Sequence, residues 1–335
     1  MNKFSSNLAL AVREIMKDPV FLQRIKYDTN GKIFWVYKAT DPGYVEFVAH
    51  HPDYSDGTPA VYTTIAAGYA AMTTNQNDVC LWNAASGFSE AMLTVSKSRC
   101  HFIGMDGGGR KNSQGARFQT PATDVAASVA VIKNTGTRNT FRNIKLSQHG
   151  LNAAQTSGFI DEGEGTYVEN CEFEVNSLLT TVTQGLLFAG DTCHYKSCQI
   201  GNSTVYHDVS LQAPLTIKVS GGQTARYSYF EDCTIIQYTA DTDSPCVQVL
   251  GAAGFIGWIS FQNCDFVNAL LGDGGTAGGA MAAAVANAGT AGYLLFDNRC
   301  TSYNATAMVS ASAYNMCAGT VGDTAAAGGV AVAAA

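Results

Sequence analysis

A short motif that returns at intervals of about thirty residues constrains the fold of this chain more than any other feature. Each copy holds an apolar residue, two further residues, a cysteine or isoleucine, and another apolar residue two positions later. The copies are Phe141-Arg-Asn-Ile144-Lys-Leu146, Val168-Glu-Asn-Cys171-Glu-Phe173, Tyr195-Lys-Ser-Cys198-Gln-Ile200, Phe230-Glu-Asp-Cys233-Thr-Ile235, Phe261-Gln-Asn-Cys264-Asp-Phe266 and, with the cysteine displaced by one, Phe296-Asp-Asn-Arg-Cys300. A period in this range indicates an array of stacked units.

The units are built from strands, because apolar and polar residues alternate within each copy. Cys171, Phe173 and Val175 would face one way, and Glu172 and Glu174 the other. A second apolar strand precedes most copies, at 129–133, 185–190, 215–219 and 247–251. Each coil is therefore predicted to be strand, turn, strand and a loop of variable length, which explains the uneven spacing of the copies.

Stacking coils about 4.8 Å apart places each motif position on top of itself. The cysteines would form a column in the core, and the polar residue before each would form a ladder at the corner, where its side chain bonds to turn backbone. The expected members are Asn143, Asn170, Cys171, Ser197, Cys198, Asp232, Cys233, Asn263, Cys264 and Asn298. A metal site is the alternative, but the closely spaced cysteine pairs that zinc uses are missing. We expect no metal and no cofactor.

Residues 59–72 are predicted to form a helix that caps the open end of the core. Thr58 would be its N-cap, and Pro59 would occupy the first helical position. Ile65, Tyr69 and Met72 fall on one face and would cover the first coil.

Four segments near the start of the repeat carry a resemblance to a known family. They are GKIFWVY, SDGTPAVYTTIAAGYAAM, NDVCLWN and SKSRCHFIGMDGG, which lie within residues 31–104. With the repeat, they resemble the right-handed parallel β-helix family, the pectate-lyase-like fold, over residues 31–310. The resemblance implies an all-β solenoid of about six to seven coils with a short N-terminal helix and a cap helix.

The GKIFWV opening, the following D-G-T, the helix and the NDVCL run are more narrowly similar to uncharacterised β-helix proteins of tailed bacteriophages. This resemblance implies a component of the virion rather than a secreted enzyme. The small size of the chain favours a non-enzymatic capsid decoration or stabilising protein over a tailspike. Its partners would be the major capsid protein or other virion proteins, and it would form a homo-oligomer, with a trimer as one arrangement. The alternative is a tail-associated protein, of a spike or fibre, that binds or depolymerises a glycan.

Two segments lie outside the repeat and are expected to make contacts in an assembly. Residues 1–30 are predicted to form a helix and a docking arm. The helix would have an apolar face that includes Leu8, Val12, Ile15 and Met16. Residues 311–335 are an Ala/Gly-rich tail of small side chains. Charged residues make up only 14% of the chain, which favours packing against a neighbouring subunit.

Charge and hydropathy exclude several classes of partner. The net charge of −7 offers no attraction to nucleic acid or to anionic membranes. No apolar run has the ~20 residues that a membrane span needs, and the N-terminus is not typical of a signal peptide. We therefore expect a protein made in the host cytoplasm, with reduced cysteines, and incorporated into the virion.

Glu172 and Glu174 are the strongest catalytic candidates. They share a strand face at about 6.6 Å, which suits an inverting pair, whereas Asp265 lies three coils away, about 14 Å. The alternative, which we favour, is a solvated outer face without catalytic function. We expect the three tryptophans to pack in the core or cap: Trp35, Trp82 and Trp258. If they were exposed instead, they would allow weak contact with a glycan.

Overall fold

The computed structural model describes residues 31–83, 87–105, 116–122, 128–150, 153–176, 183–206, 212–269, 280–310 and 315–317. The expected N-terminal helix, with its docking residues Leu8, Val12, Ile15 and Met16, lies outside the described residues, as does most of the tail 311–335. The described part contains strands in three parallel sheets and two short helices, α3 (Tyr44–His50) and α4 (Ile65–Ala71). None of its helices is long and apolar enough to span a membrane.

The three sheets contain 11, 8 and 7 strands. In spatial order, the 11-stranded sheet holds β2 (Val61–Tyr62), β1 (Ile33–Tyr37), β3 (Val79–Asn83), β6 (His101–Gly104), β9 (Thr140–Arg142), β12 (Tyr167–Glu169), β15 (His194–Lys196), β18 (Ala225–Glu231), β21 (Phe255–Gln262), β24 (Gly292–Phe296) and β26 (Asn315–Cys317). The 8-stranded sheet holds β25 (Thr301–Tyr303), β22 (Asp265–Asn268), β19 (Thr234–Gln237), β16 (Gln199–Gly201), β13 (Glu172–Val175), β10 (Lys145–Gln148), β7 (Arg117–Gln119) and β4 (Phe88–Ser89). The 7-stranded sheet holds β23 (Val285–Asn287), β20 (Val247–Val249), β17 (Leu215–Ile217), β14 (Gln184–Phe188), β11 (Ser157–Asp161), β8 (Ala130–Asn134) and β5 (Leu93–Val95).

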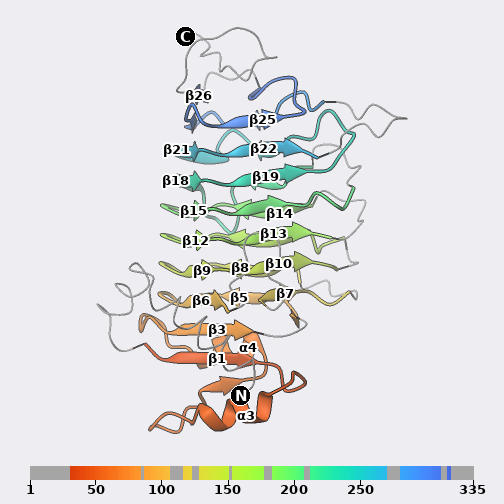
Figure 1. The fold of residues 1–335 in the computed structure, drawn as a ribbon. Helices are drawn as coiled ribbons and strands as arrows, with labels where there is room; N and C mark the ends of the chain where they lie inside the picture. Colours follow the sequence, from red (N-terminus) through yellow and green to blue (C-terminus); the bar gives the residue numbers. More distant parts are fainter. Residues whose placement is uncertain are drawn as a thin grey trace.

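From β3 to β25 the chain visits the three sheets in turn, so most strands pair with the strand three places later in the sequence. All strand pairs are parallel, and Figure 1 shows the resulting column of coils, with α3, α4 and β1 at one end and β25 and β26 at the other. This is a right-handed parallel β-helix, and its seven strands in the smallest sheet agree with the predicted six to seven coils. The fold class is confirmed.

The core consists of like residues stacked on like, as the repeat predicts. The rings of Tyr195, Phe230, Phe261 and Phe296 lie on four successive strands of the 11-stranded sheet and stack at centroid distances of 4.9, 5.1 and 5.2 Å. All four side chains are buried. Offset stacking at this spacing adds to the free energy gained from burying apolar area.

The polar ladder occupies the corner between the 11-stranded and 8-stranded sheets. Asn143, Asn170, Ser197, Asp232 and Asn263 all have φ between 52° and 56°, a left-handed conformation that Asn and Asp tolerate best. Asn170 Nδ2 donates to Asn143 Oδ1 at 2.8 Å, and Asn263 Nδ2 donates to Asp232 Oδ1 at 2.6 Å. The backbone N–H groups of the first four each donate to a carbonyl of the next coil.

The expectation that Asn298 continues this ladder is wrong. Asn298 is exposed, and Asp297 Oδ1 accepts the backbone N–H of Asn263 at 2.9 Å instead. The last copy of the motif contains one extra residue before Cys300, which shifts the side chain at the corner by one position.

The cysteine column lies immediately inside the same corner. Cys171, Cys198, Cys233 and Cys264 are buried free thiols, and each Sγ lies 3.3 or 3.4 Å from the carbonyl oxygen two residues earlier. Burial raises the pKa of the Cys198, Cys233 and Cys264 thiols well above the ordinary value. These thiols therefore remain protonated, and they act as small apolar side chains with a weak donor.

The cap helix begins later than the start at residue 59 that the sequence predicts. α4 starts at Ile65, and its N-cap is Thr64, whose Oγ1 accepts from the backbone N–H of Ala67. Thr58 is not the cap, because the segment after Pro59 is extended and its residues 61–62 pair with β1. Ile65, Tyr69 and Met72 are buried against the core as expected. The helix α3 was not predicted.

The polar ladder predicts that two substitutions of Asn170 lower the free energy of unfolding by different amounts. Replacement by Ala removes the hydrogen bond to Asn143. It also places at φ 53° a residue that has a Cβ but no polar side chain to stabilise the left-handed conformation. We therefore expect the free energy of unfolding to fall by about 1–3 kcal/mol. Replacement by Gly removes the same bond but relieves the backbone cost, so the loss should be smaller. Urea denaturation of both variants tests this, and equal destabilisation would contradict the backbone argument.

Candidate functional site

The outer face of the 8-stranded sheet carries a column of polar residues in one register. From β7 to β25 the column reads Arg117, Lys145, Glu172, Gln199, Thr234, Asp265 and Thr301. Ser147 and Glu174 stand opposite each other in the neighbouring outward column. β10, β13 and β16 therefore bring a lysine, two glutamates and their hydrogen-bonding partners together.

Lys145 joins the two candidate carboxylates. Its Nζ lies 3.1 Å from Glu172 Oε1 and 3.1 Å from Glu174 Oε2, so these two oxygens are no more than about 6.2 Å apart. Both glutamates point outward from the core, yet each is only 5% exposed. The expectation of a solvated face is wrong here, because the ammonium group of the preceding coil compensates the carboxylates and makes their burial tolerable.

Neutral side chains complete the cluster. Ser147 Oγ and Asn176 Nδ2 both donate to Glu174 Oε1, and Gln199 Nε2 donates to Glu172 Oε1 at 3.2 Å. Asn176 Nδ2 also lies 3.4 Å from His149 Nε2. The ion cluster, defined as Lys145, Ser147, Glu172, Glu174, Asn176 and Gln199, thus connects three successive coils.

Burial has a large effect on the acidity of Glu172. It raises the pKa of this carboxyl to about 7; Lys145 opposes the rise and Glu174 adds to it. Glu172 Oε2 is buried and accepts no hydrogen bond within the described part of the chain. A carboxyl that is half protonated near neutral pH fits this position, because one ammonium group shared by two buried carboxylates leaves one negative charge uncompensated.

The cluster has some features of a hydrolase site but not its open space. A carboxyl with a pKa near 7 beside a second carboxylate resembles an acid–base pair. Glycoside hydrolysis also needs room for a sugar and a water molecule between the carboxylates. Here the Lys145 ammonium lies between them. The geometry therefore describes a structural ion cluster better than a catalytic one.

Other acidic residues in the described ranges do not converge on a site. Asp161 points into the core, where Tyr195 Oη donates to its carboxylate at 2.6 Å and burial raises its pKa. Glu162 pairs with Lys133, and Glu164 is exposed. Asp265 is separated from Glu172 by β16 and β19. The described residues contain no group of three or more His, Cys, Asp or Glu side chains that could hold a metal ion.

The outer face of the 7-stranded sheet lacks carboxylates along its central column. From β5 to β23 this column reads Thr94, Lys133, Ile160, Leu187, Thr216, Gln248 and Ala286. Ile160 and Leu187 pack with Ala130 in a small apolar cluster outside the main core. This face therefore has no acid–base pair in register.

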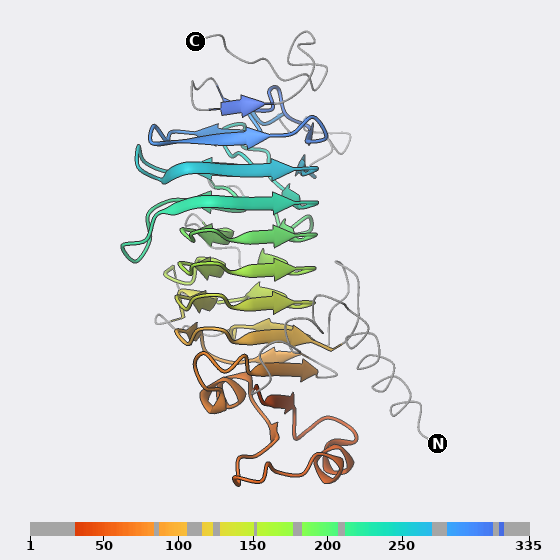
Figure 2. The ribbon, with the colours of Figure 1, turned by 90° about the vertical axis from the view of Figure 1, so that its left-hand side faces the viewer.

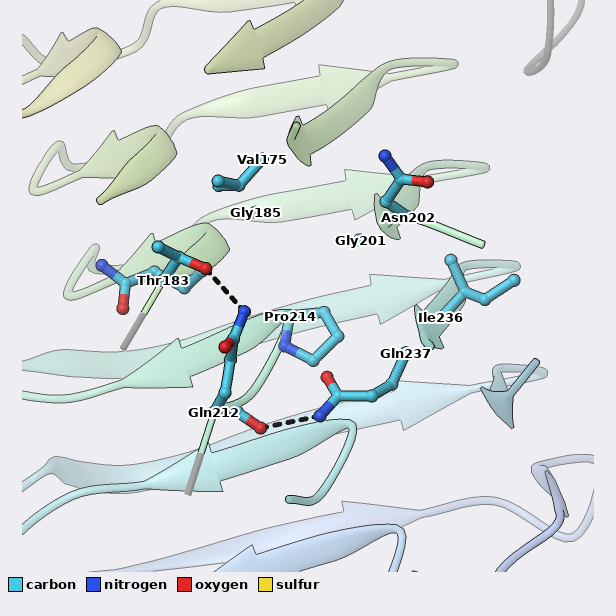
Figure 3. A pocket seen from close by; sticks show the side chains of 10 residues that line it. Val175, Thr183, Gly185, Gly201, Asn202, Gln212, Pro214, Ile236 and Gln237 are labelled. Atoms are coloured by element: carbon cyan, nitrogen blue, oxygen red, sulfur yellow. Dashed lines mark hydrogen bonds between the residues drawn. The ribbon is translucent and has the colours of Figure 1, made fainter. Parts of the chain in front are cut away.

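A small hollow lies where β13, β16 and β19 lead into the 7-stranded sheet (Figure 3). Thr183, Gln212 and Gln237 line it; Gln212 Nε2 donates to Thr183 Oγ1, and Gln237 Nε2 donates to the Gln212 carbonyl oxygen. Its volume of about 20 Å³ has room for a single water molecule. The hollow is too small to bind a sugar.

The three tryptophans have different environments. Trp82 is fully buried and donates to the Ala116 carbonyl oxygen, as expected for a core position. Trp35 packs on Phe47 and His51 beside α3, but it is only partly buried and lies outside the main core. The expectation is wrong for Trp258, which lies half-buried on the outer face of β21. Its neighbour Ile259 points inward in its place.

The contact between Lys145 and Glu172 was not identified from the sequence. The signal was available, because Lys145 precedes Glu172 by 27 residues, one step of the repeat, and like positions stack. Lys145 also contacts Glu174, two residues along the neighbouring strand. This second contact depends on the conformation of the long lysine side chain. The spacing of the repeat does not predict it.

No protein-family model and no curated protein matches this chain. Among solved structures, it is similar to a pectin methylesterase from Aspergillus niger (17% identity, TM-score 0.46, covering 81% of this chain and 85% of that one) and to the pectate lyase Pel9A (14%, 0.49, 84% and 68%). It is also similar to the pectin methylesterase PemA from Erwinia chrysanthemi (11%, 0.45, 85% and 92%). At these values the similarities carry no information about activity, and the link to phage proteins rests on sequence resemblance alone.

The ion cluster predicts a specific pH dependence of stability. Because the pKa of folded Glu172 is about 7, above its ordinary 4.5, the folded state holds the extra proton between these values. The stabilisation that this proton provides is fully present below pH 4.5 and is lost as the pH rises through 7. We expect Glu172→Gln to flatten the change in Tm between pH 5 and pH 8.

The matched control is Glu169→Gln, which removes a carboxylate paired with Arg142 on the neighbouring sheet. This variant should keep the wild-type pH dependence. An unchanged slope in Glu172→Gln would contradict the assignment of the proton to this cluster.

Proposed function

We propose that this chain is a non-catalytic structural protein of a tailed-phage particle, in the role of a capsid decoration or stabilising protein. The observation that carries the non-catalytic part is the ion cluster. Its two carboxylates form the best-placed acidic pair among the described residues, and they are buried and joined to Lys145. Such a pair stabilises the stack of coils rather than attacking a substrate.

The particle role is supported by the sequence. The GKIFWV opening and the N-D-V run resemble virion β-helix proteins, and the charged fraction of 14% favours a protein with packed neighbours. Residues 1–30 would supply the docking arm and the major capsid protein the docking surface. The inner coils form a rigid stack, because each of them is bonded to both neighbours along three sheets.

The glycan-binding part of the alternative, a tail-associated protein, is favoured by one specific observation. Several aromatic side chains are exposed on the outer face of the 11-stranded sheet. A binding surface of this kind is compatible with either location on the particle.

Quantitative mass spectrometry of purified particles tests the proposal. A decoration protein should be present in a copy number comparable with that of the major capsid protein, and the purified chain should release no reducing ends from polysaccharides. A copy number matching the tail proteins would favour the alternative. Absence from particles would contradict a virion role, and polysaccharide cleavage that is lost in Glu172→Gln would contradict the non-catalytic assignment.

A further inference from the structure

An aromatic stripe crosses five successive strands on the outer face of the 11-stranded sheet, the face that Figure 2 presents. Its members are Tyr167 on β12, His194 on β15, Tyr227 and Tyr229 on β18, Trp258 on β21 and Tyr293 on β24. Consecutive rings from Tyr167 to Trp258 have centroids 4.7–5.9 Å apart, and Tyr293 pairs with Trp258 in register. The stripe is therefore continuous along the axis of the solenoid.

The rings of the stripe on β18 and β24 remain accessible to solvent. Tyr227, Tyr229 and Tyr293 are 43%, 40% and 46% exposed, and Ile256 beside them is also exposed. Rings that served only the core would point inward, as Tyr195 and Phe230 do on the same strands. A contiguous patch of exposed aromatic residues marks an interaction surface.

The backbone is distorted where the stripe is densest. A β-bulge between Arg226 and Ser228 leaves Tyr227 with a φ of 48°, a conformation that is costly for a residue with a bulky side chain. Opposite it, Gly257 has a φ of 76°, and a Cβ there would lie 2.4 Å from Tyr227 Cε1. The bulge and the glycine together aim the Tyr227 ring at Trp258, 5.9 Å away, without adding anything to the core.

A polar column borders part of the stripe, two residues along the strand from Tyr167, His194 and Tyr229. It holds Arg142, Glu169, Lys196, Glu231 and Gln262 in register. Its charges alternate and pair with each other, as in Arg142 with Glu169 and Lys196 with Glu231. The border therefore offers donors and acceptors with little net charge, which does not select an ionic ligand.

We propose that the aromatic stripe binds a neutral polysaccharide chain that runs parallel to the solenoid axis. Apolar faces of sugar rings pack on aromatic rings, while hydroxyl groups bond to a polar border such as this one. The coils repeat every ~4.8 Å, close to the length of one pyranose ring, so successive sugars meet successive coils. The inference goes beyond a structural role in the particle and does not depend on it.

Native gel electrophoresis with neutral polysaccharides embedded in the gel tests the inference, using dextran, laminarin, galactomannan and arabinoxylan as the probes. At least one should retard the wild-type protein. Trp258→Ala and Tyr229→Ala should each raise the dissociation constant tenfold or more, and Trp258→Phe, which keeps a ring, should lose less. Circular dichroism checks that these variants, altered at partly exposed positions, remain folded.

Tyr303→Ala is the matched control, because Tyr303 is 55% exposed but lies on the 8-stranded sheet. It should bind as the wild type does. No retardation with any of the four polysaccharides, or equal loss in Tyr303→Ala, would overturn the inference. So would a change in oligomeric mass on Trp258→Ala without an effect on binding, which would assign the stripe to contact between copies of this chain. The copy number in particles is measured separately, so the two proposals can fail independently.

Discussion

The in-register stacking of each coil on its neighbours is the constraint on which the rest of this structure depends. A residue in one coil meets its equivalent in the next, so a favourable contact is repeated along the column and an unfavourable one would be repeated as well. This explains the aromatic stacks through Phe230 and Phe261, the cysteine column and the Asn ladder. It also explains how two outward carboxylates can be buried, since the coil before them supplies Lys145 at the same position.

The same constraint separates the functions of the faces. The outer face of the 8-stranded sheet uses its charges internally, because Lys145, Glu172 and Glu174 bind each other across two coils. The outer face of the 11-stranded sheet instead exposes rings along the axis, with paired charges beside them. The proposed non-catalytic role rests on this difference between a polar face whose charges pair with each other and an accessible aromatic face.

The sequence predicted what the repeat determines, and little beyond it. The cysteine and Asn columns, the parallel solenoid and the capping role of Ile65, Tyr69 and Met72 follow from periodicity and pattern. Trp258 was placed wrongly because it stands in an apolar run, which predicted burial, whereas simple alternation with the buried Ile259 and Phe261 puts it on the outer face. The start of α4 was misplaced because pairing with β1 overrode the helix signal at Pro59.

Hydrogen–deuterium exchange of the backbone amides tests most directly whether stacking on neighbours stabilises each coil. Coils with two neighbours, such as those of β11 to β16, should show the strongest protection, and protection should fall toward β1 and toward β25. Equal protection from end to end would mean that the column unfolds as one unit. Weaker protection at the centre than at the ends would contradict the account, because the ion cluster would then destabilise the coils that it connects.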